Sequence, residues 1–263
     1  MFVPETTSRP PDGLVIPHDE QLIFTILTHL PFFYSAYVAL ANLFGKGDPV
    51  CLLFLIGGTI SCVFEPIIDV LGFCYFPRPG NWVAYEWHNR PIPLFVPATY
   101  GWFVGGLGYW VLTLFQSGTM TRRGLWLLWL RNFAFNLILE YPALYWGMYV
   151  YYGHQPFEVA GFPLWFPACH ALAPLVSATV VHVLRHELTG VAALAIIPTV
   201  TSTYGMANIG GGWPVWIALS VDKGIGDSYL GGFGTVFLLA VSIWTLSTAF
   251  PKTLGARPKP HYA

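Results

Sequence analysis

CLLFLIGGTISCVFEPIIDVLGF, residues 51–73, decides the fold class of this chain. The stretch is apolar and long enough to cross a bilayer, which takes about 20 residues, yet it carries Glu65. A second stretch of this kind, LWLLWLRNFAFNLILEYPALYWGMYVYY (125–152), carries Glu140. An ionisable side chain at such a depth costs about 3 kcal/mol on insertion scales. We therefore expect both glutamates to face inward, onto a site.

The composition is that of a membrane protein. The 263 residues are 55% hydrophobic and only 10% charged, whereas a soluble domain carries about 25% charged residues. The mean hydropathy is +0.56. A net charge of −1 does not indicate nucleic-acid binding, and the four cysteines lack the CxxC spacing of a zinc site or a thiol relay.

Hydropathy predicts an all-α, polytopic membrane protein with seven transmembrane helices in a single domain, 1–263. A polar N-terminal tail (1–20) and a C-terminal tail (251–263) flank the helices. Two long connections are rich in Trp and Tyr and are interpreted as lids on one membrane face: 75–91 and 210–227. The predicted spans are 21–44, 50–74, 92–116, 124–151, 161–184, 189–209 and 228–250.

Basic residues predict the orientation. With the N-terminus outside and the C-terminus inside, eight of the twelve basic side chains lie at the inner face, as the positive-inside rule requires. These eight are Lys46, Arg122, Arg123, Arg131, Arg185, Lys252, Arg257 and Lys259. Arg9, Arg78, Arg90 and Lys223 then lie outside.

Titratable groups recur at one depth in four of the spans. Each lies about 8–11 residues from the outer end of its span, or about 12–16 Å below the outer surface. The four groups are Glu65, Glu140, His170 and His29. Asp69 follows Glu65 by four residues, and Asn136 precedes Glu140 by four, so each shares a helix face with its glutamate. This shared depth is the strongest functional signal in the sequence.

Further candidates surround this cluster. Trp102, Tyr100 and Tyr141 lie in the same half of the spans, and His88 and Arg90 lie in the outer connection. We interpret these five residues as substrate-binding, together with Asn136 and His29, with His88 and Arg90 closing the access to the site. Prolines follow the acidic residues closely, as in Glu65-Pro66, and each frees a backbone carbonyl one turn earlier.

Carboxylic acids in an apolar cavity can stay protonated at neutral pH and act as acid–base pairs. Aromatic faces stabilise cations, and 17% of the residues are aromatic. This combination suits protonation of an alkene or epoxide in a lipophilic, isoprenoid-type substrate, followed by cyclisation or double-bond migration. We predict an enzyme without a cofactor, in which Glu65 and Glu140 are donor and partner while Asp69 and His170 tune or relay the proton.

Two alternatives stay open. Glu65, Asp69, Glu140 and His170 could form a carboxylate-rich metal site, which would indicate a metal-dependent oxidoreductase or hydrolase. A proton-coupled transporter or ligand-binding membrane protein also places acids at mid-membrane. Substrate, product and oligomeric state are not readable from the sequence.

The chain size, the seven spans and the glutamate in CVFEPIIDV (62–70) resemble the small integral-membrane terpene cyclases of meroterpenoid pathways. In that family a glutamate on an early helix and an aspartate on a late one are thought to act as acids. Glu65 matches the first position. The last span has no aspartate, and Asp227 lies only at its outer edge. Membrane-bound carotenoid-modifying enzymes resemble the chain about as well.

Overall fold

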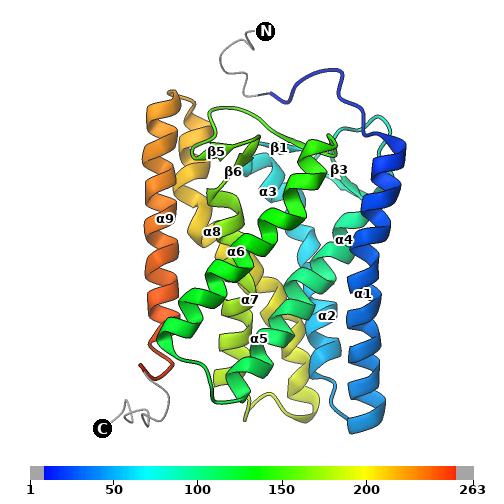
Figure 1. Cartoon of the computed structure of the whole chain (residues 1–263), viewed down its shortest axis with the longest axis vertical. Helices are drawn as coiled ribbons and strands as arrows, with labels where there is room; N and C mark the ends of the chain where they lie inside the picture. The colour runs from blue at the N-terminus through cyan, green and yellow to red at the C-terminus, as the bar shows by residue number, and fades with distance from the viewer. Residues whose placement is uncertain (1–8, 253–263) are drawn as a thin grey trace.

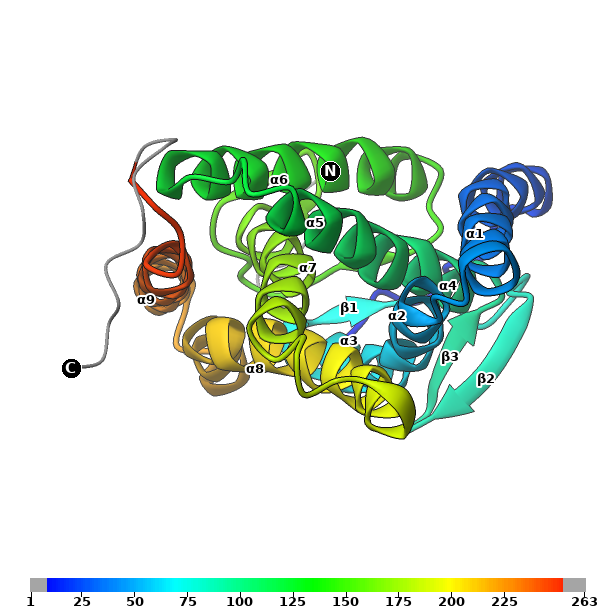
Figure 2. The ribbon, with the colours of Figure 1, turned by 90° about the horizontal axis from the view of Figure 1, so that it is seen from below.

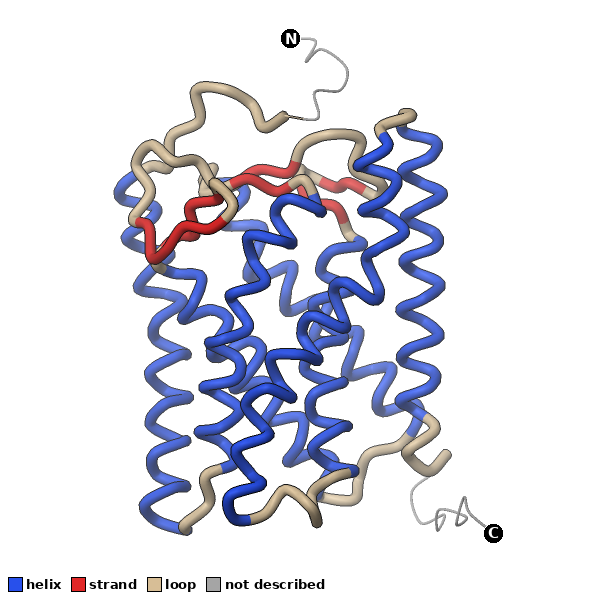
Figure 3. The backbone as a smooth tube through the Cα atoms, turned by 180° about the vertical axis from the view of Figure 1, so that it is seen from behind, coloured by secondary structure: helices blue, strands red, loops and turns tan. Residues whose placement is uncertain are grey.

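The structure, a computed structural model, describes residues 9–252. Long helices run side by side, and short strands gather at one end of the bundle, which we call the strand end (Figures 1 and 3). The α-helices are α1 (His18–Lys46), α2 (Val50–Ile60), α3 (Glu65–Gly72), α4 (Phe95–Tyr100), α5 (Leu107–Gln116), α6 (Arg122–Tyr145), α7 (Trp165–Val183), α8 (Ile196–Val221) and α9 (Ile225–Ser247). Two 3₁₀ segments, η1 (Ser61–Phe64) and η3 (Gly190–Ala195), precede α3 and α8, and a π-helical segment, η2 (Gly101–Gly106), joins α4 to α5.

Five helices are long and apolar enough to cross a membrane. They are His18–Lys46, Val50–Gly72, Trp165–Val183, Gly190–Val221 and Ile225–Ser247. The remaining two predicted spans correspond to α4–η2–α5 and to α6, which lie in the same bundle (Figure 1). Polar and charged residues such as Arg131 and Glu140 make α6 less apolar than these five.

Burial separates inner from outer helices. In the most apolar window of α7, 78% of the residues are buried, against 17% for α1. Figure 2 shows α7 inside the bundle, with α1 and α9 at opposite ends of its cross-section. Large apolar side chains are exposed along α1 and α9, as Phe44 and Phe237 show. Such helices present apolar surface where a membrane protein meets lipid.

The connections at the strand end are folded rather than irregular, so the all-α prediction is incomplete. Three two-stranded antiparallel sheets form there, because these connections are rich in aromatic and β-branched residues that favour strands. They pair β1 (Cys74–Tyr75) with β4 (Val150–Tyr151), β2 (Val83–Trp87) with β3 (Arg90–Pro93), and β5 (Glu158–Val159) with β6 (Phe162–Pro163).

Two glutamines attach these connections to the helices. The Gln21 amide of α1 donates to the Gly80 carbonyl at 2.7 Å and accepts from the Trp82 N–H at 2.8 Å. The buried Gln155 amide donates to the Gly72 carbonyl at the end of α3 (2.9 Å) and accepts from the Trp165 indole of α7 (3.2 Å). The first predicted lid, 75–91, is therefore a hairpin fixed to the bundle.

The second predicted lid, 210–227, is wrong over most of its length, because α8 continues to Val221. Gly211 of this segment and Gly231 of the following helix serve helix packing. A Cβ on Gly211 would lie 2.7 Å from the Leu239 side chain of α9, and one on Gly231 would lie 2.6 Å from the Pro214 carbonyl oxygen. Close approach of helices through small residues is typical of membrane bundles.

The predicted tails also differ from the structure. Residues 18–20 already belong to α1, and Ile16 is buried, with its N–H donating to the Pro79 carbonyl at 3.0 Å. At the other end, the Pro251 carbonyl accepts from the Arg122 N–H at 3.1 Å. Residues 1–8 and 253–263 of the predicted tails, with Arg257 and Lys259, lie outside the described residues.

Candidate active site

An apolar cavity lies between α3, α4, α6, α7 and α8, about 8–12 Å below the strand end at the helical rise per residue. Its volume is about 60 Å³, which is room for a few water molecules. Half of its lining residues are Phe or Tyr: Phe24, Phe76, Phe95, Tyr100, Phe103, Tyr149, Tyr151, Phe166 and Tyr204. Five residues predicted from the sequence line it: Glu65, Glu140, His170, Asn136 and Tyr100.

The helix break at Pro66 positions Glu65. Pro66 cannot donate the helical hydrogen bond to the carbonyl of Cys62, and the helix tightens to the 3₁₀ segment η1 just before it. The Cys62 carbonyl accepts instead from the Glu65 N–H, three residues later, and from the Tyr85 hydroxyl of β2. The first turn of α3 then carries Glu65 into the cavity wall.

Glu65 ends a chain of hydrogen bonds that crosses four segments. The Tyr100 hydroxyl of α4 donates to Glu65 Oε2. It lies 2.6 Å from the Tyr204 hydroxyl of α8, which lies 3.2 Å from Nε2 of His170 on α7. Because each tyrosine has one proton to donate, donation runs in one direction, from His170 through Tyr204 and Tyr100 to Glu65. We call these four residues the relay.

Glu140 is held separately from the relay. Asn136 Nδ2, one turn earlier on α6, lies 3.3 Å from Glu140 Oε1, and the Tyr149 hydroxyl donates to Glu140 Oε2. Tyr149 returns over the helix end because α6 stops at Tyr145 and Gly147 adopts φ +72°, a turn conformation suited to glycine. Each cavity glutamate thus accepts a hydrogen bond from a tyrosine.

Asp69 does not line the cavity. It is 1% exposed, and its carboxyl group interacts with the Cys74 thiol and with the charge of Arg90. Its Oδ2 atom has no hydrogen-bond partner within residues 9–252. Both residues lie on one face of α3, as the i, i+4 spacing predicts, but Asp69 is one turn, about 6 Å, nearer the strands, beside Cys74 of β1. Asp69 is therefore a neighbour of the site rather than a part of the cavity.

Three other predicted residues lie outside the cavity. His29 donates to the Thr25 carbonyl of its own helix at 2.8 Å, so its ring is satisfied within α1. Trp102 packs edge-on against Phe135 in a groove beside the cavity. The Tyr141 hydroxyl donates to the Val159 carbonyl at 3.1 Å. Depth alone did not show which face of its helix each residue occupies.

The outer connection holds itself together. His88 is exposed and stacks on the neighbouring Trp87 ring, while Arg90 donates to the Tyr152 hydroxyl at 3.0 Å. Neither residue lines the cavity, so no contact with the cavity supports the prediction that these two side chains close the site.

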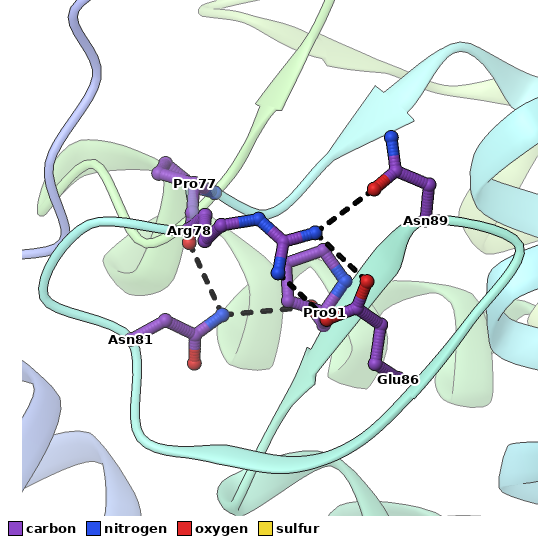
Figure 4. Close-up of polar contacts among 6 residues, drawn as sticks. All are labelled: Pro77, Arg78, Asn81, Glu86, Asn89 and Pro91. Carbon is purple, nitrogen blue, oxygen red and sulfur yellow. Dashed lines mark hydrogen bonds and ion pairs between the residues drawn. The ribbon is translucent and has the colours of Figure 1, made fainter.

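Arg78 is the centre of a clamp on the β2–β3 hairpin. It binds both carboxylate oxygens of Glu86, at 2.6 and 2.8 Å, and Asn89 at 3.0 Å (Figure 4). The hydrogen bonds from Arg78 lower the pKa of Glu86. Asn81 closes the turn by donating to the Pro77 carbonyl at 3.1 Å. This set of bonds gives the hairpin a fixed shape at the strand end.

The metal-site alternative gains no support from the arrangement of ligand side chains. Within residues 9–252, no three His, Cys, Asp or Glu side chains lie close enough together to hold a metal ion. His182, at the opposite end of α7, packs on the rings of Phe115 and Phe250. Asp227, compared above with a late-helix acid, is exposed in the first turn of α9.

Two tyrosines of the site, Tyr204 and Tyr149, were not predicted from the sequence. Tyr204 is the only tyrosine in α8 and is flanked by small and polar residues (TSTYGMAN, 201–208), so a polar group within a span was a usable signal. Tyr149 had no such signal, because it was assigned to the end of a span and only the turn at Gly147 brings it to Glu140.

Comparisons of the chain with protein-family models, with curated proteins and with solved structures gave no match. The resemblance to small membrane terpene cyclases stays a prediction from the sequence.

Proposed function

We propose that the chain is a multi-pass membrane protein with seven crossings, its strand end outside and its C-terminus inside. Five helices that can span a membrane, with α4–η2–α5 and α6 beside them, support this topology. Lys46 ends α1, Arg122 begins α6 and Arg185 follows α7, all at the end opposite the strands, in agreement with the positive-inside rule.

We further propose that it is an enzyme that acts on a lipophilic, isoprenoid-type substrate by acid–base catalysis. One observation carries this proposal: Glu65 and Glu140 line the same cavity, and half of the residues that line it are Phe or Tyr. Enzymes that protonate carbon need an acid in a site that excludes water, and aromatic faces stabilise the resulting cation. The cavity provides both.

In the proposed reaction, Glu65 transfers its proton to an alkene carbon or epoxide oxygen of the substrate. The cation that forms is stabilised by the aromatic lining, cyclises or rearranges, and loses a proton from a neighbouring carbon to Glu140. The proton count of substrate and product is then equal. Tyr100 stabilises the Glu65 carboxylate that remains. Once the product has left, the empty cavity has room for the few waters that return the proton from Glu140 to Glu65.

The relay gives His170 and Tyr204 a positioning role. Their chain of bonds orients the Tyr100 hydroxyl toward Glu65 and offers a second route for a proton to reach it. Hydrogen-bond chains in a low-dielectric interior polarise one another, so the loss of one member weakens the others.

The test is mass spectrometry of lipid extracts from cells supplied with isoprenoid precursors and expressing the wild type, Glu65→Gln or Glu140→Gln at matched levels. Glu158→Gln is the control, since Glu158 is exposed on β5 away from the cavity. We expect a product isomeric with its precursor in the wild type and the control, and a loss of at least about 100-fold in the other two.

Full turnover by a properly folded Glu65→Gln or Glu140→Gln variant would remove that residue from the mechanism. If no precursor yields a product and proteoliposomes instead show proton-coupled uptake that Glu65→Gln abolishes, the enzyme proposal is wrong and the cavity belongs to a transporter.

A further inference from the structure

A groove opens on the side of the bundle between α1 and the upper part of α6. In Figure 1, α4 lies between these two helices, and the π-helical segment that continues α4 forms the floor through Trp102. The groove has a volume of about 290 Å³. It is lined by Phe24, Leu27, Thr28, Pro31, Trp102, Phe135, Ile138, Leu139 and Pro142.

The groove lining suits a hydrocarbon chain. None of its residues is charged, and the Thr28 hydroxyl is satisfied by the Phe24 carbonyl of its own helix at 3.0 Å. The indole N–H of Trp102 is buried and has no acceptor within residues 9–252, which leaves a single donor in the wall. At the rim, Leu27 is 54% and Ile138 is 71% exposed, so the groove opens on the apolar side of the bundle.

The groove adjoins the cavity. Phe24 and Leu139 line both spaces, so these two side chains form the wall that they share. The cavity, at about 60 Å³, holds a reactive end but not a whole lipid. A lipophilic substrate that reaches the glutamates must leave its remaining length outside the cavity.

A second opening is less suited to a hydrocarbon chain. A bowl at the strand end shares Tyr149 and Tyr151 with the cavity, and Tyr141 and Tyr145 also line it. Four phenol rings at the water-facing end fit a polar environment better than an alkyl chain. The groove, with its aliphatic rim, is the favoured place for the tail.

Prolines on both flanking helices make the wall deformable. Pro31 of α1 and Pro142 of α6 both line the groove, and neither can donate the helical hydrogen bond to the residue four positions earlier. Those two residues are Leu27 and Ile138, at the rim. Each helix therefore lacks one backbone hydrogen bond where the groove must widen to admit a chain.

We propose that the groove holds the hydrocarbon tail of the substrate, which reaches the site sideways from the bilayer between α1 and α6. The substrate class is then a membrane-dissolved molecule with a long apolar chain whose reactive group sits at one end. This inference rests on the proposed function for the fate of the reactive end, whereas binding of the tail is measurable without turnover.

The experiment labels the purified protein in detergent with a C15 prenyl alcohol that carries a diazirine near its far end, followed by peptide mapping. Ile138→Trp fills the groove. Leu230→Trp on α9 is the matched control, since Leu230 is 72% exposed against 71% for Ile138. We expect labelled peptides from α1 and α6, reduced about tenfold by Ile138→Trp and unchanged by Leu230→Trp.

Equal labelling of wild type and Ile138→Trp, or labelling confined to the tyrosine-lined bowl, would overturn the inference. Leu27→Trp, from the opposite wall, repeats the test if Ile138→Trp does not fold. Glu65→Gln separates the two proposals, because it should keep full groove labelling. If Ile138→Trp blocks the labelling while Glu65→Gln forms as much product as the wild type, the groove proposal stands and the catalytic mechanism is rejected.

Discussion

Replacing Gly58 by alanine should separate two helices that meet almost without side chains. A Cβ on Gly58 of α2 would lie 2.6 Å from the Cα of Gly105 in η2 and 3.0 Å from the Tyr100 carbonyl oxygen. Carbon atoms in ordinary contact lie about 3.5–4.0 Å apart, so α2 and η2 must part by about 1 Å. The obstacle is backbone on both sides, which cannot rotate away.

The size of the effect follows from this geometry. Overpacking of this kind costs about 1–3 kcal/mol, which lowers the melting temperature of a chain of this size by about 2–12 °C. The shift also moves Tyr100, whose hydroxyl holds Glu65, and a misplacement of about 1 Å at a catalytic group can cost about 100-fold in rate. Gly58→Ala should therefore lose activity even below its melting temperature.

The assay is thermal unfolding in detergent, followed with a thiol-reactive dye. All four cysteines are free and buried, so they react only as the structure opens. Gly210→Ala in α8 is the control, because a Cβ there would meet no atom within 4 Å and alanine favours a helix. A Gly58→Ala protein that melts within about 1 °C of the wild type would refute the contact between α2 and η2.

Three further predictions follow from single contacts. Tyr204→Phe removes the central hydroxyl of the relay and should lower kcat about 10- to 100-fold with an altered pH profile and a nearly constant KM, whereas a merely structural residue would leave the pH profile unchanged. Tyr85→Phe removes one of the two donors to the Cys62 carbonyl, since the Glu65 N–H remains, and should cost about 0.5–1.5 kcal/mol in the same thiol-dye melting assay; an unchanged melting temperature would contradict this bond. Since Arg78 lowers the pKa of Glu86, that carboxylate supports the hairpin above the pKa of the unfolded chain, and the support is lost as pH falls through the lowered value. Hydrogen-exchange protection of β2–β3 should then be lower at about pH 3 than at about pH 6, and Glu86→Gln should show the lower protection at both; equal protection of the wild type at both would contradict the clamp.

The helical bundle and the core of the site were readable from the sequence for one physical reason. Apolar runs of membrane length predict helices, and a charged group within such a run must face the interior. Glu65, Glu140 and His170 obey this rule and meet at one cavity. His29 does not, because a ring that bonds the carbonyl one turn earlier is satisfied without facing the interior.

The partners of the glutamates were less readable than the glutamates themselves. Tyrosine is common both at the membrane interface and in helix interiors, so its presence does not indicate which role it has. Tyr100 and Tyr141 were predicted on equal grounds, yet Tyr100 bonds Glu65 while Tyr141 bonds the backbone at Val159. The difference lies in the direction of each side chain, which the hydropathy of the spans does not indicate.

Glycine misled the prediction for residues 210–227, because a membrane reverses its usual meaning. In a soluble protein the run GGGWP (210–214) indicates a loop, since glycine in a helix loses the most conformational entropy and exposes its backbone to water. Between packed membrane helices there is no water to compete for the backbone, and the missing side chain lets a neighbour approach. Gly211 uses that space for Leu239, just as Gly58 uses it for Gly105. A glycine run inside an otherwise apolar stretch is therefore better interpreted as a helix contact, and the length of the apolar stretch should decide between contact and loop.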